Sequence, residues 1–175
     1  MQNLLKAFLI VILFSSCFSK VKETKQSKFY FDLKGYFSNL ATTLNQQNPE
    51  INKTVSKNDL KESKRIKIPN WKEELALFME ADINKPAWKD SYTKDSSSTK
   101  IIYKSNDADL KTQKIEISLT NGKPTRIHIE TSADNLLYQT KENLDFYPDS
   151  LYSIQKKQTV VLLGENNYQI IGKMN

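Results

Sequence analysis

The chain has 175 residues, with 26 lysine and arginine side chains, 20 acidic ones and a net charge of +6. Nearly all of its basic side chains are lysines, and because phosphate and base recognition favour the planar arginine fork, this charge does not favour a nucleic-acid partner. One cysteine (Cys17) excludes a disulfide framework within the chain, and one histidine (His128) leaves a zinc site without its usual ligands.

An apolar segment precedes the cysteine. Residues 7–14 are uninterrupted apolar residues after a short polar start that contains Lys6, and Ser15 and Ser16 lead into Cys17. A membrane-spanning helix needs about 20 apolar residues, whereas the core of a secretory signal needs about 7–15. The segment is therefore predicted to be a signal peptide, residues 1–16, rather than a transmembrane helix.

The run Leu13-Phe14-Ser15-Ser16-Cys17 resembles the lipobox that ends the signal peptides of bacterial lipoproteins. This resemblance implies cleavage before Cys17, acylation of its thiol and amine, and anchoring in a membrane by the acyl chains. Phe18 stands where an aspartate would favour inner-membrane retention in some bacteria, so the resemblance implies the outer membrane. The alternative is an ordinary signal peptide that is removed together with Cys17.

The next segment is predicted to be a tether. Residues 20–28 hold four lysines and one glutamate with few apolar residues, a composition typical of a flexible, solvated linker. The predicted organisation is a signal peptide at 1–16, an acylated flexible tether at 17–28 and one globular domain at 29–175. In style, the whole chain resembles small envelope lipoproteins of Bacteroidota-like bacteria.

Two amphipathic helices are predicted in the first half of the domain. Leu33, Phe37, Leu40 and Leu44 recur with helical spacing, which indicates a helix over about 32–47. A second helix is predicted to start at a capping Asn70 and to end near residue 82. Between them, alternating residues at 51–57 and 63–68 predict a hairpin around the polar segment 57–62.

Strands follow in the second half of the chain. Residues 95–98 are predicted as a loop and 99–104 as a strand, and 111–119 and 124–131 are predicted to form a hairpin. A three-residue loop at 120–122 pairs residue 117 with 125, which keeps the isoleucines on one face and sets Glu116 beside Arg126. A two-residue turn would instead pair 117 with 126 and mix the faces.

The last segments complete the predicted sheet. Strands are expected at 136–146, 152–163 and 168–173, and because Val160 to Leu163 and Ile170-Ile171 are apolar on both faces, their hairpin is predicted to lie centrally, covered on both sides. The expected fold is α+β, an antiparallel sheet of about six strands with two amphipathic helices packed on one face.

The candidate catalytic and metal residues do not assemble into a motif. His128 shares a predicted polar strand face with Lys114, Glu116, Arg126 and Glu130, without a nucleophile elbow or glycine-rich loop. The oxygen-rich turn at 106–109 lacks the glycine and glutamate of a calcium loop. We therefore expect a non-catalytic protein that needs no cofactor and no metal.

Two sets of residues are candidates for binding. Aromatic residues on the late strands, Tyr138, Phe146, Tyr152 and Tyr168, line either an apolar ligand site or the core. An antiparallel sheet cupping an apolar cavity under helices would share its architecture with envelope lipid carriers such as the Lol family. The second set, Lys57, Lys61, Lys64 and Arg65, lies in the basic segment 53–67, which is either a solvated face or a contact for an anionic partner.

The expected function is therefore that of a membrane-anchored envelope lipoprotein with a binding domain for an apolar ligand or an envelope component. The alternative is an assembly lipoprotein that contacts an anionic protein partner through the basic segment.

Overall fold

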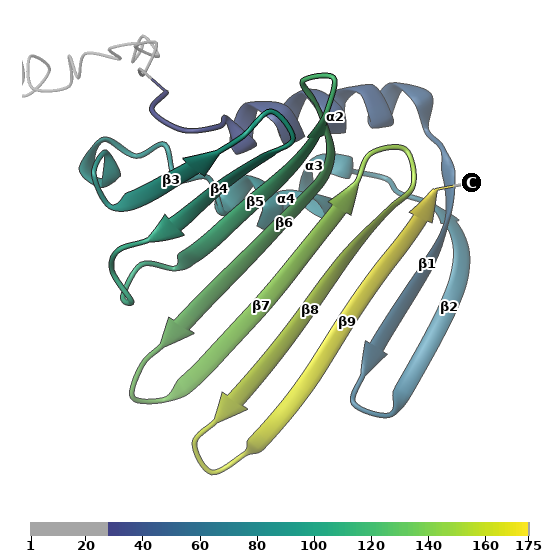
Figure 1. Cartoon of the computed structure of the whole chain (residues 1–175). Helices are drawn as coiled ribbons and strands as arrows, with labels where there is room; N and C mark the ends of the chain where they lie inside the picture. Colours follow the sequence, from purple (N-terminus) through teal and green to yellow (C-terminus); the bar gives the residue numbers. More distant parts are fainter. Residues whose placement is uncertain (1–27, 175) are drawn as a thin grey trace, which may run out of the picture.

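One antiparallel sheet of nine strands organises the domain (Figure 1). The computed structural model describes residues 28–174, so Cys17, the signal peptide and nearly all of the tether lie outside the described residues. The strand order is β2-β1-β9-β8-β7-β6-β5-β4-β3. The strands are β1 Glu50–Lys57, β2 Leu60–Lys67, β3 Tyr92–Ser96, β4 Lys100–Ser105, β5 Thr112–Thr120, β6 Lys123–Asp134, β7 Tyr138–Tyr147, β8 Leu151–Val160 and β9 Gly164–Met174.

The predicted α+β class, an antiparallel sheet with helices packed against it, is confirmed, but the predicted numbers of six strands and two helices are wrong, because residues 28–174 contain nine strands and three α-helices. Six were expected, and the difference arises partly because β3 begins before the segment 95–98 that was predicted as a loop. The N-terminal hairpin also joins the main sheet, because β1 pairs with β9 and places Ile51 opposite Met174. That pairing joins segments more than 100 residues apart in the sequence, so no local sequence pattern predicts it.

Helix α2, Leu33–Gln47, confirms the first helix prediction. The side chain of Asp32 caps its N-terminus by accepting a hydrogen bond of 2.9 Å from the backbone N–H of Gly35. Asn48 ends the helix in the left-handed region, with φ of 46°. The apolar stripe of the sequence is the buried face, which contains Leu33, Phe37, Ala41 and Leu44.

The second helix is shorter and broken. Asn70 caps it as predicted, accepting from the backbone N–H groups of Lys72 and Glu73, but α3 ends at Glu74 and α4 runs from Ala76 to Glu80. The residues around the break are good helix formers, so packing rather than propensity sets it. Leu75 at the break is fully buried. A 3₁₀ turn, Pro86–Trp88, then leads to β3.

Aromatic rings fill the space between the helices and the sheet. The ring centroid of Phe37 on α2 lies 4.8 Å from that of Phe78 on α4 and 5.2 Å from that of Phe146 on β7. Trp71 on α3 lies edge-on to Tyr152 on β8 at 6.3 Å. Since Phe146 and Tyr152 are register partners on one sheet face, the three α-helices within residues 28–174 all cover that face, which we call the inner face.

The β5–β6 hairpin keeps its isoleucines on the inner face, but its turn and its register differ from those predicted. Its turn has two residues, Asn121 and Gly122, both with positive φ (51° and 74°), as a type I′ turn requires. A β-bulge between Ser118 and Leu119 then shifts the register, so Ile117 pairs with Ile127. The three-residue loop is therefore wrong, and Glu116 lies opposite His128 rather than beside Arg126.

The β8–β9 hairpin is central in the sheet order, yet the expectation that its apolar residues are covered on both sides is wrong. The chain turns at residues 161–163, before Gly164, instead of at residues 164–167. Val161, Leu162 and Leu163 therefore form the turn itself and are exposed.

Gly172 on β9 is required by the ring of Tyr152, its register partner on β8. A Cβ atom at residue 172 would lie 2.1 Å from Cε1 of that buried ring. Gly172→Ala should lower the free energy of unfolding by about 1–3 kcal/mol, the usual cost of overpacking a core. Urea denaturation followed by circular dichroism measures this loss.

The matched control repeats the glycine substitution in a Tyr152→Ala background, where the ring is absent. There Gly172→Ala should cost less than half as much. An equal cost in both backgrounds would show that the ring does not impose the glycine.

Candidate binding surface

The four late-strand aromatics do not form one site. Phe146 and Tyr152 are fully buried beneath the helices, so they belong to the core. Tyr168 is half-buried, with the Lys57 ammonium 5.5 Å from its ring centroid. Tyr138 lies at the start of β7 and pairs with Val160, at the opposite end of that strand from Phe146. Only Tyr138 and Tyr168 are accessible to a partner.

A polar group inside the domain ties α3 to the sheet. The hydroxyl of Tyr152 donates a hydrogen bond of 2.5 Å to Glu74 Oε1, and Lys53 Nζ on β1 lies 2.7 Å from the same carboxylate group. Burial, and then the Glu74 carboxylate, raise the pKa of Tyr152 far above its ordinary value. The phenol therefore stays a neutral donor, and the three side chains act as a structural clamp between helix and sheet.

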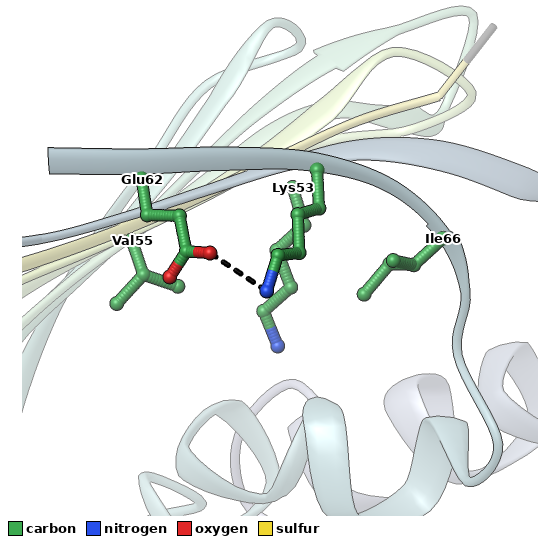
Figure 2. A pocket seen from close by; sticks show the side chains of 5 residues that line it. Lys53, Val55, Glu62 and Ile66 are labelled. Atoms are coloured by element: carbon green, nitrogen blue, oxygen red, sulfur yellow. Dashed lines mark ion pairs between the residues drawn. The ribbon is translucent and has the colours of Figure 1, made fainter.

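A shallow pocket lies on the inner face of the β1–β2 hairpin, lined by Lys53, Val55, Glu62, Lys64 and Ile66. Figure 2 shows these side chains on the inner face of the hairpin. The dashed line is the ion pair between Glu62 and Lys64. Its volume is about 90 Å³, whereas pockets for drug-sized ligands usually have about 300–1,000 Å³. This pocket can hold a few water molecules but no substantial ligand.

The four predicted basic contact residues are divided between the two faces of the sheet. Lys57 and Lys64 share the inner face with Ile51, while Lys61 and Arg65 point to the outer face. Arg65 Nε lies 3.1 Å from Glu50, and Lys64 Nζ lies 2.7 Å from Glu62. Because β2 is an edge strand, its charges also protect an open row of backbone groups from association. A single flat partner cannot contact all four residues.

The predicted polar face around His128 is the outer face of the sheet, where it forms a ladder of ion pairs. His128 Nδ1 lies 3.0 Å from Asp145 and His128 Nε2 lies 3.3 Å from Glu130. Arg126 contacts the same Asp145 oxygen at 2.7 Å. Both ring nitrogens thus face carboxylates rather than a hydroxyl or thiol, so this ladder has the geometry of a charged surface and lacks that of a nucleophilic dyad.

Most of the exposed large hydrophobic side chains of residues 28–174 gather at one end of the sheet, whereas Phe29 lies apart from them, beside Lys89. The β6–β7 turn carries Leu136 and Leu137, the β8–β9 turn carries Val161, Leu162 and Leu163, and Leu60 follows the β1–β2 turn. Leu162 is 99% exposed and Leu136 is 95% exposed. The strand order and directions place all three turns at the same end, at the bottom of Figure 1. We call these three turns the hairpin tips.

Hydrogen bonds hold the hairpin tips in defined positions. The side chain of Asn135 accepts from the backbone N–H groups of Leu137 and Tyr138, at 2.9 and 3.0 Å. The N–H of Val161 donates to the Leu137 carbonyl at 3.0 Å, which joins the first two tips. Asn58 and Asn167 join the third by reciprocal bonds of 2.8 Å. These hydrogen bonds therefore hold the exposed leucines of the turns in fixed positions relative to one another.

Sequence reasoning singled out Tyr138 beside the tips but missed the leucines and valine. It read Val160 to Leu163 as a buried strand, because a short apolar run looks the same in a core and at an exposed turn. The available signal was Gly164, a residue suited to positive φ that directly follows the run.

Within residues 28–174, no helix is long and apolar enough to cross a membrane. The same residues contain no group of three or more histidine, cysteine or acidic side chains placed to hold a metal ion. Comparison of the chain with known proteins finds no matching family model, curated protein or solved structure.

The outer-face ladder should make stability depend on pH. The hydrogen bond from Lys100 is the largest influence on Glu116; burial opposes it, and the charges of Lys100 and Lys114 add to it, so the pKa of Glu116 is lowered. A lowered pKa means that this stabilisation is present above the unfolded-state value of about 4.3 and is lost as the pH falls through the folded-state value. Stability should therefore decline below about pH 5.

Glu116→Gln should lower the free energy of unfolding at pH 7 by about 0.5–1 kcal/mol, the range of partly exposed ion pairs. It should also flatten the decline between pH 5 and pH 3, as measured by urea midpoints across that range. Glu62→Gln is the matched control, because Glu62 and its partner Lys64 are well exposed. Identical acid profiles for wild type and Glu116→Gln would contradict the prediction.

Proposed function

We propose that this protein is a lipid-anchored lipoprotein of the bacterial cell envelope, in the outer membrane rather than the inner one, whose sheet domain is a non-catalytic binding module. The anchor is supported by the lipobox-like run that ends at Cys17, which lies outside the described residues. The binding role is carried by one observation, the exposed aliphatic side chains on the hairpin tips. Exposed apolar groups that gather in one place are typical of interaction sites.

Of the two kinds of binding partner expected from the sequence, an envelope component that contacts the surface fits the domain better than an apolar ligand enclosed under the helices. The space under the helices is occupied by two groups of rings in contact, Phe37, Phe78 and Phe146 in one and Trp71 and Tyr152 in the other. A ligand there would have to displace packed rings, at a cost comparable to that of opening a cavity. The hairpin tips, by contrast, meet a partner without any rearrangement of the core.

A second candidate, contact with an anionic protein through the 53–67 hairpin, is supported in a narrower form. Lys57 and Lys61 are exposed and flank the β1–β2 turn, so they lie at the same end of the sheet as the aliphatic side chains. Lys64 and Arg65 lie further along β2, each beside a glutamate. The basic contact is therefore better treated as part of the tip surface than as a separate site.

The anchor is tested by the intact mass of the protein produced with its own N-terminus in a Gram-negative host. The mature chain should begin at Cys17 and carry acyl chains, whereas Cys17→Ser should carry none, because the thiol that accepts the lipid is missing. Ser16→Ala is the control and should be acylated like wild type. A mature chain without lipid that begins after Cys17 would identify an ordinary signal peptide.

The binding role is tested by a photo-cross-linking amino acid placed at residue 136, on the β6–β7 tip, in intact envelopes. Adducts should form from this position and not from position 123, which lies at the opposite end of β6 and is also exposed. Equal adducts from both positions, or none from residue 136, would remove the hairpin tips from the proposal.

A further inference from the structure

The hairpin tips expose apolar side chains without benefit to the fold. Leu162 has a φ of 70°, a left-handed conformation that costs a bulky side chain roughly 1–2 kcal/mol and that glycine or asparagine adopts more readily. The chain thus has a leucine where local physics favours a small or polar residue, and its side chain is almost fully in water. We therefore attribute Leu162 to a contact with another molecule.

The kinds of side chain at the tips separate a lipid partner from a protein partner. Hot spots of protein interfaces are enriched in tryptophan, tyrosine and arginine, and leucine and valine are under-represented there. The two main tips carry Leu136 and Leu137 on one and Val161, Leu162 and Leu163 on the other. They are also protruding turns rather than one flat patch, a shape that enters a deformable surface more readily than it fits a rigid one.

Charge around the hairpin tips favours an anionic surface. Residues 135–140 and 158–164 carry no charge, so the β6–β7 and β8–β9 tips have no charged residue at their apices. The segments 134–141 and 156–165 behind these two tips and the segment 57–61 at the β1–β2 tip together hold five lysines and three acidic residues. Lys141 and Lys157 are direct register partners on β7 and β8. Lysines opposite each other repel, and an anionic headgroup between them would relieve that repulsion even though Lys157 also pairs with Glu165 at 2.8 Å.

The spacing along the strands agrees with the layers of a bilayer. Lys141 follows Tyr138 by three residues, which is about 10 Å of strand. Apolar groups of peripheral proteins enter about 5–10 Å into the boundary between headgroups and acyl chains, with lysines and tyrosines at headgroup level. If Leu136 and Leu137 lie at the boundary with the acyl chains, Tyr138 lies nearer to the headgroups and Lys141 lies among or above them.

We propose that the β6–β7 and β8–β9 tips insert into the surface of an anionic lipid bilayer. Leu136, Leu137, Val161, Leu162 and Leu163 enter the apolar boundary, and the lysines behind them meet the headgroups. This inference rests on the proposed function, since it names the envelope component that the tip surface binds. It adds a second contact with a membrane, independent of the acyl chains on Cys17.

The test places a fluorophore at one tip and a substitution at the other. The full chain carries Cys17→Ser, which removes the acylated thiol, and Leu136→Cys labelled with an environment-sensitive dye. With vesicles of phosphatidylethanolamine and phosphatidylglycerol, the emission should shift to the blue and rise at least twofold, and acyl-chain quenchers should reduce it. With vesicles of a zwitterionic lipid alone, the change should be several-fold weaker.

Two controls separate insertion from other events. A label at Lys123→Cys, at the opposite end of β6, should show no blue shift, so adsorption through residues 1–16 cannot imitate the result. In the Leu136-labelled chain, Leu162→Asn should lower the apparent vesicle affinity by about tenfold, the value of one buried leucine. Because asparagine tolerates positive φ, this variant should unfold at the same temperature as its parent or a higher one.

The opposing outcomes are distinct. An unchanged emission at residue 136, or equal shifts at residues 136 and 123, would overturn bilayer insertion. A shift that depends on protein concentration and not on vesicles would replace it with self-association. If the vesicle assay fails while cross-linking at residue 136 yields protein adducts, the proposed binding role stands and only the bilayer is excluded. If both fail, both proposals fall.

Discussion

The contact between the aromatic rings of the helices and the inner face of the sheet is the constraint on which the rest of the domain depends. Phe37 and Phe78 meet Phe146, and Trp71 meets Tyr152, whose ring in turn requires Gly172 on the next strand. These contacts bury one face of a sheet that would otherwise expose a continuous apolar surface. They also fill the space that the helices and the sheet of residues 28–174 enclose.

The strands β6 to β9 continue beyond the region that the helices cover (Figure 1). There the inner face becomes polar, and Glu142 is buried by its neighbours while it accepts a hydrogen bond of 2.8 Å from Thr131. The extension carries the hairpin tips away from the core. In our proposal, folding and binding therefore use different parts of the same strands, so tip residues can change without disturbing the ring contacts.

The two membrane contacts in our proposals differ in kind. Acyl chains on Cys17 would hold the protein in an envelope membrane effectively permanently, whereas the few aliphatic side chains of the tips would bind reversibly. A weak second contact orients a domain that the first contact merely tethers. The lysine-rich composition suits both, because lysines beside an anionic surface add attraction that salt screens.

The local sequence determined the elements whose signals are local. The 3.6-residue spacing from Leu33 to Leu44 and the cap at Asn70 predicted helix positions, and alternation predicted which isoleucines of β5 and β6 share a face. The predicted register of the β5–β6 hairpin was wrong because two arrangements keep the isoleucines on one face. One is the predicted three-residue loop, and the other is the observed two-residue turn followed by a bulge. Sequence periodicity constrains which face a side chain occupies more strongly than it constrains the pairing.

Only the tertiary structure decided the sheet size and the surface at the hairpin tips. The pairing of β1 with β9 joins distant segments, and its free energy comes from contacts that no local window contains. The apolar run at residues 160–163 reads identically as a buried strand and as an exposed turn, and its exposure follows from where β8 ends. The sequence by itself determined the lipobox-like run, the buried stripe of α2 and the inward-facing isoleucines of β5 and β6, since these depend on order and period alone.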